Sequence, residues 1–143
     1  MDRYDASGNI EAQFEPGSDG RVLRNLLGIR DPAVMDDVEL DLLDLLYDQV
    51  PSMVLQTERI RVEHIRAWHQ RWLGTVFEWA GKDRSVNLAK GGFQFAMARQ
   101  IGSLLETFDQ ITLAQYTPCV KMDDEALVEA IAIVHVEFIL IHP

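Results

Sequence analysis

Apolar residues recur at helical spacing along most of the chain. Positions three and four residues apart share one face of a helix, so such a repeat predicts an amphipathic helix. Val34, Val38 and Leu42 begin one such series. Residues 1–20 are polar and interrupted by glycine and proline, so they are expected to form an arm or loops. The predicted helical segments are a short turn at 21–27 and helices over 31–50, from 57 or 58 to 74 or 81, over 97–109 and over 123–141.

Residue types that begin and end helices support two of these boundaries. Asp31 can accept hydrogen bonds at an N-cap, and Pro32 suits the first helical position. Gly28 is expected to stop the short turn before them. Pro51 is expected to end the helix because proline lacks the backbone N–H that the helix needs.

The last predicted helix is apolar nearly all round. Asp123-Asp124-Glu125 place three acids at its start, where the helix dipole favours negative charge. From Ala126 to Ile141 only Glu129, His135 and Glu137 interrupt the apolar residues. The segment is too short to span a membrane, which takes about 20 apolar residues. Such a helix belongs at the centre of a bundle. Because the chain stops just after it, we expect an incomplete domain.

A β-hairpin is predicted in the middle of the chain. Residues 84–88 and 93–96 are strand-like, and Ala89-Lys90-Gly91-Gly92 separate them. Paired glycines supply the positive φ angles that a tight hairpin turn requires. The predicted fold class is therefore all-α, with one short β-hairpin.

Composition and charge limit the classes of partner. A chain of 143 residues suffices for one domain with a core. Its net charge of −10 argues against nucleic acid or an anionic membrane as a partner. Residues 31–48 hold several acids and no base, which is typical of a solvated helix face, with an acidic docking face as the alternative. The N-terminus does not resemble a secretory signal, and Cys119 is the single cysteine, so a cytoplasmic location is expected.

Few side chains point to chemistry by themselves. The sequence contains no P-loop, CxxC, HExxH or GxSxG motif. His142 follows the apolar helix and precedes Pro143, which fits a plain helix terminus as well as a functional histidine. Lys90-Gly91-Gly92 is, taken alone, an ordinary turn. No metal site is predicted, because His135 and His142 share a helix face without further ligands nearby.

Three further polar positions lie in apolar helices. His64 and His69 are five residues apart and so lie on different faces, which indicates packing or surface roles. Glu137 should be partly exposed or paired with an arginine such as Arg66 or Arg84, because an unpaired buried carboxylate is costly.

Four stretches, in their order and spacing, together resemble the Fic (Fic/Doc) family along nearly the whole chain. They are Glu15-Pro16-Gly17 with Val22 to Ile29, His64 to His69 running on to Phe77 to Gly81, Arg84 to Asn87 with Lys90 to Ala96, and His135 to Pro143. The last resembles the helix that leads into the family motif HxFx(D/E)GNGRxxR, with His142 as its first residue and Pro143 in the variable second place. The resemblance implies a Fic-type helical bundle lacking its C-terminal helices, with 1–30 as an N-terminal arm and lead-in segment and 31–143 as an incomplete Fic domain.

The resemblance also implies an activity, the transfer of AMP from ATP to a Ser, Thr or Tyr hydroxyl of a protein, with Mg²⁺ as the metal. Related members transfer other phosphate-containing groups. By this resemblance His142 would be the general base. The protein target would dock at the flap, residues 84–96, by strand-like pairing. The flap residues that would border the nucleotide are Lys90, Gly91, Gly92 and Phe93.

The resemblance predicts negligible transferase activity for these 143 residues. The acid, the glycine-rich loop and the arginine of the family motif are not among them, and phosphoryl-type transfer depends on such groups. The nearest match to the family's inhibitory motif, Ser7 to Glu11, is interpreted as chance because Ala12 fills its final place, so control is expected from a separate inhibitory protein or from residues after 143. Two alternatives stay open: a non-catalytic protein-interaction module that uses the flap edge and the acidic helix, and an enzyme completed by a second polypeptide.

Overall fold

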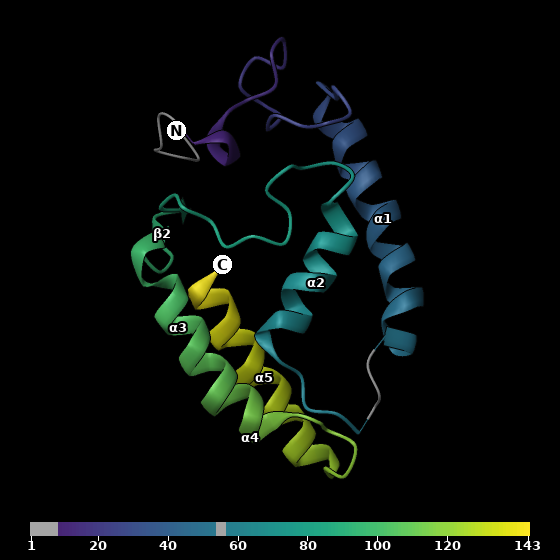
Figure 1. Cartoon of the computed structure of the whole chain (residues 1–143), viewed down its shortest axis with the longest axis vertical. Helices are drawn as coiled ribbons and strands as arrows, with labels where there is room; N and C mark the ends of the chain where they lie inside the picture. The colour runs from purple at the N-terminus through teal and green to yellow at the C-terminus, as the bar shows by residue number, and fades with distance from the viewer. Residues whose placement is uncertain (1–8, 54–56) are drawn as a thin grey trace.

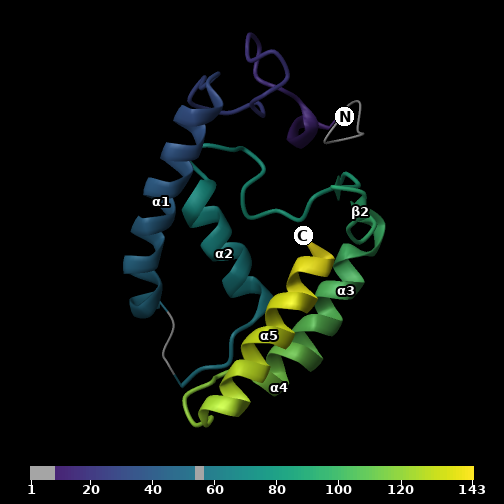
Figure 2. The same ribbon diagram turned by 180° about the vertical axis from the view of Figure 1, so that it is seen from behind.

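The computed structural model describes residues 9–53 and 57–143, and helices dominate it (Figure 1). α1 (Pro32–Met53) and α2 (Val62–Leu73) lie side by side. α5 (Asp124–Ile141) lies on the other side of α2, next to the preceding helical segment, as Figures 1 and 2 show from opposite directions. The only sheet of the described residues is a two-stranded hairpin. The predicted fold class, all-α with one short hairpin, is confirmed.

α1 begins as predicted and ends later. Asp31 Oδ1 accepts a hydrogen bond from the Ala33 N–H at 2.9 Å, which caps the first turn. Pro51 lies inside the helix, which continues to Met53, so the prediction that Pro51 ends it is wrong. A proline in the last turn removes only one helical hydrogen bond, and the helix can therefore extend a little past it.

α2 begins later than the predicted start at 57–58. The backbone before it is bonded elsewhere, because the Ile60 N–H donates to Thr117 Oγ1 at 2.9 Å. The Arg61 N–H donates to His64 Nδ1 at 3.0 Å, which closes the first turn of the helix. The bond to Thr117 engages the backbone before α2 with a distant segment, and no local sequence pattern records it.

The helix predicted over 97–109 is longer than expected and runs over 98–116. The helix continues past Asp109 because an apolar side chain there packs into the core: Leu113 is 1% exposed. Asp109, the predicted end, instead accepts the Val62 N–H through Oδ1 at 2.8 Å. The consecutive helical pieces are η2 (Ala98–Gln100), α3 (Ile101–Thr107), η3 (Phe108–Leu113) and α4 (Ala114–Tyr116).

The segment before α1 is irregular, with several turns and one short 3-10 helix, η1 (Ile10–Ala12). The first eight residues of the predicted arm lie outside the described part of the chain. The helical turn predicted at 21–27 is absent from the structure. The Val22 carbonyl accepts from the Glu15 N–H at 2.8 Å, and the Val22 N–H donates to Ser18 Oγ at 3.3 Å. Both backbone groups of Val22 are thus taken by the preceding loop and are not available to a helix.

The predicted hairpin is present with shorter strands, β1 (Ala89–Lys90) and β2 (Phe93–Gln94). Gly91 and Gly92 have φ angles of +58° and +83°, and both form the two-residue turn. Pairing therefore begins directly beside the glycines, so Ala89 and Lys90 are strand residues and not part of the turn as predicted. Residues 84–88, predicted as a strand, form none in the structure.

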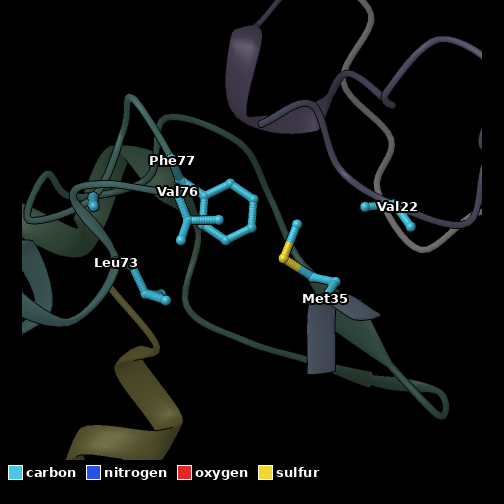
Figure 3. Close-up of a cluster of buried hydrophobic side chains, with 6 residues drawn as sticks. Val22, Met35, Leu73, Val76 and Phe77 are labelled. Atoms are coloured by element: carbon cyan, nitrogen blue, oxygen red, sulfur yellow. The ribbon is translucent and has the colours of Figure 1, made fainter. Parts of the chain in front are cut away.

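The core consists of two apolar clusters, and α2 contributes to both. Leu73 at the end of α2 belongs to the first, together with Val22 and Met35, as Figure 3 shows. Val62 at the start of α2 belongs to the second. The other buried members of the second cluster are Ile101, Leu105, Phe108, Leu113 and Ile141.

α5 packs on one side only against the described residues. Ala130 and Ile141 are buried, whereas Val128 is 68% and Ile131 58% exposed. The sequence predicted a helix at the centre of a bundle; in the structure one face of α5 is packed and the opposite face is exposed. In the described ranges no helix is both long and apolar enough to cross a membrane.

Candidate functional site

His142 lies at the C-terminal end of α5. Its backbone is left-handed, with φ 46° and ψ 64°, and its N–H donates to the Phe138 carbonyl at 2.9 Å. A residue in the left-handed conformation at this position ends a helix, so His142 is the residue that terminates α5. Its imidazole also stacks on the Phe95 ring, with centroids 4.4 Å apart and planes at 22°. The helix end and the segment after β2 therefore meet at this histidine.

The surroundings of His142 favour a neutral imidazole. Partial burial lowers its pKa, and the positive charges of Arg84 and Lys90 lower it further. The ordinary pKa of histidine is about 6.5, so the neutral form dominates at pH 7. A neutral imidazole can accept a proton, which is the property required of a general base.

The hairpin is connected to His142 through Phe95, which directly follows β2. Phe93 is 49% exposed, and its ring meets Phe95 edge-on at 5.3 Å. Phe95 in turn stacks on His142, so aromatic contacts connect the exposed hairpin to the imidazole. Sequence reasoning did not single out Phe95. The available signal was its position two residues after Phe93, on the same face of a strand.

Two arginines have roles that the sequence did not reveal. Arg66 forms a two-pronged ion pair with Asp83, at 2.8 and 2.7 Å. Glu137 was expected to be either partly exposed or paired with an arginine. It is exposed, and neither Arg66 nor Arg84 is its partner. Arg84 points to the backbone around His142, where its guanidinium donates to the His142 carbonyl at 2.6 Å.

A cavity of about 820 Å³ lies beside His142. Trp68, Trp72 and Trp79 form much of its apolar wall. Its size falls within the range of about 300–1,000 Å³ that is usual for ligand pockets. Pro143 also lines it, and the charged residues on its walls are Glu11, Arg66, Glu78, Lys82, Asp83 and Arg84.

Two of the other histidines, His64 and His69, have structural contacts. His69 Nδ1 accepts the Gly81 N–H at 2.9 Å, and burial lowers the pKa of this imidazole. His64 closes the first turn of α2, so both agree with the predicted packing or surface roles. Over residues 9–53 and 57–143, no three His, Cys, Asp or Glu side chains are grouped so as to hold a metal ion.

The match to an inhibitory motif at Ser7 to Glu11 is only partly visible, because Ser7 lies outside the described residues. Glu11 accepts the Ser85 N–H at 2.7 Å and also the Ser85 hydroxyl. Glu11 is therefore engaged with the segment that leads into the hairpin.

Comparison with known proteins gives a consistent answer. The model of the Fic/DOC family matches residues 59–143. The protein adenylyltransferase VbhT of Bartonella schoenbuchensis is 33% identical over 107 residues, which cover 72% of this chain and 20% of that protein. The probable protein adenylyltransferase y4lH of Sinorhizobium fredii is 33% identical over 76 residues, 53% of this chain and 36% of that protein. The chain thus spans only a fifth to about a third of these relatives.

Solved structures with a similar fold include Fic domains. The N-terminal Fic domain of a VirB-translocated effector from Bartonella sp. AR 15-3 has a TM-score of 0.78 at 20% identity, over 98% of this chain and 67% of that one. The BepC protein of Bartonella tribocorum, solved with bound AMPPNP, has a TM-score of 0.67 at 20% identity, over 85% of this chain and 64% of that one. At this identity the two structures establish the fold alone.

Proposed function

Because this chain belongs to the Fic/DOC family, we propose that it supplies the general base and the target-aligning flap of a protein adenylyltransferase. The observation that carries the proposal is the contact of the His142 imidazole with the Phe95 ring, directly beside the Lys90–Phe93 turn. A base next to an exposed hairpin edge is the arrangement needed to deprotonate a hydroxyl held along that edge. The names of the two curated relatives support the same activity.

In the proposed reaction a target protein pairs with the flap and presents a Ser, Thr or Tyr hydroxyl to His142. The neutral imidazole takes the hydroxyl proton while the hydroxyl oxygen bonds to the α-phosphorus of ATP. The bond from that phosphorus to the bridging oxygen of the β-phosphate breaks, and pyrophosphate leaves. Burial, and then the positive charges of Arg84 and Lys90, lower the pKa of His142. Lys90 is exposed on the flap, so it is the better placed of the two to pair with a phosphate oxygen.

Mg²⁺ at nucleotide sites is usually held by one or two carboxylates together with the substrate phosphates. The described residues contain no group of three or more His, Cys, Asp or Glu side chains that could hold a metal ion, so they form no metal site that is complete in itself. We therefore assign no step to a metal held by these residues. A complete site needs donors that these 143 residues do not contribute, so we expect negligible transfer by the 143-residue polypeptide.

The test is transfer of label from α-³²P-ATP in the presence of Mg²⁺ to a candidate target protein. Three proteins are compared: the 143-residue polypeptide, a chimera in which the remainder of the Bartonella schoenbuchensis relative follows Pro143, and the same chimera with His142→Ala. We expect labelling only by the chimera that keeps His142. Equal labelling by the His142→Ala chimera would contradict the assignment of the base, and strong labelling by the 143-residue polypeptide would contradict its expected inactivity.

A non-catalytic interaction module is the second candidate, favoured by the outer face of α1. Leu40 and Tyr47 are 57% and 66% exposed there, and the helix carries acids without a basic residue. This surface would suit a basic partner protein, including an inhibitory one. The candidate predicts a monodisperse, cooperatively unfolding chain whose binding to that partner weakens when Asp41 and Asp44 are replaced by Asn. A chain that aggregates in light scattering would count against it.

A further inference from the structure

The Arg84 guanidinium lies between two parts of the site that are far apart in the sequence. Nε donates to the His142 carbonyl at 2.6 Å, and Nη2 donates to the Ile141 carbonyl at 3.0 Å. On the hairpin side, Nη1 donates to the Val86 carbonyl at 2.6 Å, and Nη2 also donates to the Ala96 carbonyl. One side chain therefore bonds two carbonyls at the end of α5 and two carbonyls near the two ends of the flap.

Arginine is suited to this position by its shape and its charge. Its planar group carries five N–H donors in a fixed fork, whereas lysine offers three donors from a single point. The last carbonyls of a helix lack partners within the helix and lie at the negative end of its dipole. The Arg84 cation therefore satisfies carbonyls of α5 and compensates their partial charge, while its remaining donors hold the flap.

Further contacts join the same two parts. The Ala96 N–H donates to the Leu140 carbonyl at 3.1 Å, and the Phe95 ring stacks on His142 at 4.4 Å. The Phe95 N–H donates to the Leu88 carbonyl at 3.1 Å, which closes the base of the flap. The hairpin and the last turn of α5 are thus bonded together by Arg84 and by their own backbone.

We propose that Arg84 is a positioning residue that fixes the flap and His142 to each other, so that the base and the docking edge move as one unit. The proposal rests on the proposed function, in which His142 is the base and the flap holds the target. Arg84 contacts neither the hydroxyl nor the phosphate in this scheme. It acts through the backbone on either side of the imidazole, and its loss should separate the imidazole from the flap.

The first test is native-state hydrogen exchange of the unaltered chain. If Arg84 joins the two parts, the amides of Phe95, Ala96 and His142 should open together and show similar protection. Protection of the His142 amide that differs from that of the Ala96 amide by tenfold or more would overturn the proposal. This measurement requires no variant, so it can overturn the proposal even if substitutions at Arg84 prevent folding.

The second test compares Arg84→Met, Arg84→Lys and a matched control, Arg99→Met. Arg99 is exposed in η2, close in sequence to the flap. Because each lost charge-assisted bond is worth roughly a tenfold change, we expect exchange of the Ala96 and His142 amides to rise at least about tenfold in both Arg84 variants and to stay unchanged in the control. Wild-type protection of both amides in a folded Arg84→Lys chain would refute the requirement for the arginine fork.

The third readout is the pKa of His142, followed by NMR of the imidazole. The groups that face His142 are Arg84 and Lys90 and, across the cavity that it lines, Glu11, Arg66, Glu78, Lys82 and Asp83. Burial and the two nearby cations lower this pKa, so the pKa should rise in Arg84→Met and remain the same in Arg99→Met. An unchanged pKa in folded Arg84→Met would overturn the proposal. None of these measurements uses ATP or a target, so their outcome is separate from that of the labelling experiment.

Discussion

Replacing Asp109 should destabilise the chain more than any other single acid that we consider. Asp109 Oδ1 accepts the Val62 N–H at 2.8 Å, which holds the first residue of α2. Its Oδ2 pairs with Arg59 Nη2 at 2.9 Å, where the two side chains are 26% and 18% exposed. Arg61 lies further away, at 3.7 Å. One carboxylate therefore connects the extended segment before α2 to the helical segment that contains η3.

The magnitude follows from these contacts. A hydrogen bond to a charged acceptor contributes about 1.5–3 kcal/mol, and its loss leaves the Val62 N–H without its partner. A partly exposed ion pair such as that with Arg59 adds up to about 1 kcal/mol. Asp109→Ala should therefore lower the free energy of unfolding by about 3 kcal/mol. Asp109→Asn keeps an acceptor for Val62 and loses only the charge, so about 1–2 kcal/mol is expected.

The assay is urea denaturation followed by circular dichroism, with the free energy of unfolding taken from the midpoint and slope. The control is Asp44→Ala, since Asp44 is exposed on α1 and should change stability by no more than about 0.5 kcal/mol. If Asp109→Ala were as stable as Asp44→Ala, the carboxylate would not be what holds α2 to η3. Equal losses for Asp109→Ala and Asp109→Asn would mean that charge, and not the bond to Val62, dominates.

Three further outcomes are expected. Burial lowers the pKa of His69, so below about pH 6.5 the unfolded chain binds more protons than the folded chain. The free energy of unfolding should therefore fall as the pH drops from 7 to 5, and it should fall less in His69→Gln. Identical pH profiles of the two chains would be evidence against this role of His69. Gly92→Ala should lower the free energy of unfolding by about 1 kcal/mol and raise the exchange rate of the flap amides, because φ is +83° at this position. The matched Gly102→Ala, in a helix with open space around it, should stabilise the chain by about 0.5–1 kcal/mol in the same denaturation assay. A neutral Gly92→Ala would contradict the turn geometry. Leu113→Ala should destabilise by about 3 kcal/mol, because this side chain is 1% exposed in the second cluster, and a loss below 1 kcal/mol would mean that the site collapses without a cavity.

Much of the fold could be predicted from the sequence because its helices obey local rules. The Asp31 cap and the acids at the start of α5 are local signals, and the structure confirms both. Asp123 Oδ1 indeed accepts the Ala126 N–H at 2.9 Å. The failures at residues 21–27 and before α2 have another origin, because distant or looped-back groups take the backbone bonds that a helix would use. A periodicity argument contains no information about such partners.

The candidate site was predictable in part. The resemblance indicated His142 and the flap, and in the structure the Phe95 ring of the flap stacks on the His142 imidazole. Arg84 could not be recognised as the residue that joins them, because its four acceptors are backbone carbonyls near the two ends of the flap and at the end of α5. Backbone carbonyls carry no residue identity, so the sequence gives no pattern for such a contact.

The cavity beside His142 has a built-in optical reporter. The chain contains three tryptophans, and Trp68, Trp72 and Trp79 all line this cavity. Trp72 Nε1 donates to the Glu39 carbonyl at 2.9 Å, whereas Trp79 Nε1 is buried without a hydrogen-bond partner among the described residues. Indole emission moves to shorter wavelength as water leaves the ring. Filling of the cavity by a peptide or a small molecule should therefore be visible as a blue shift of the intrinsic fluorescence, without any added label.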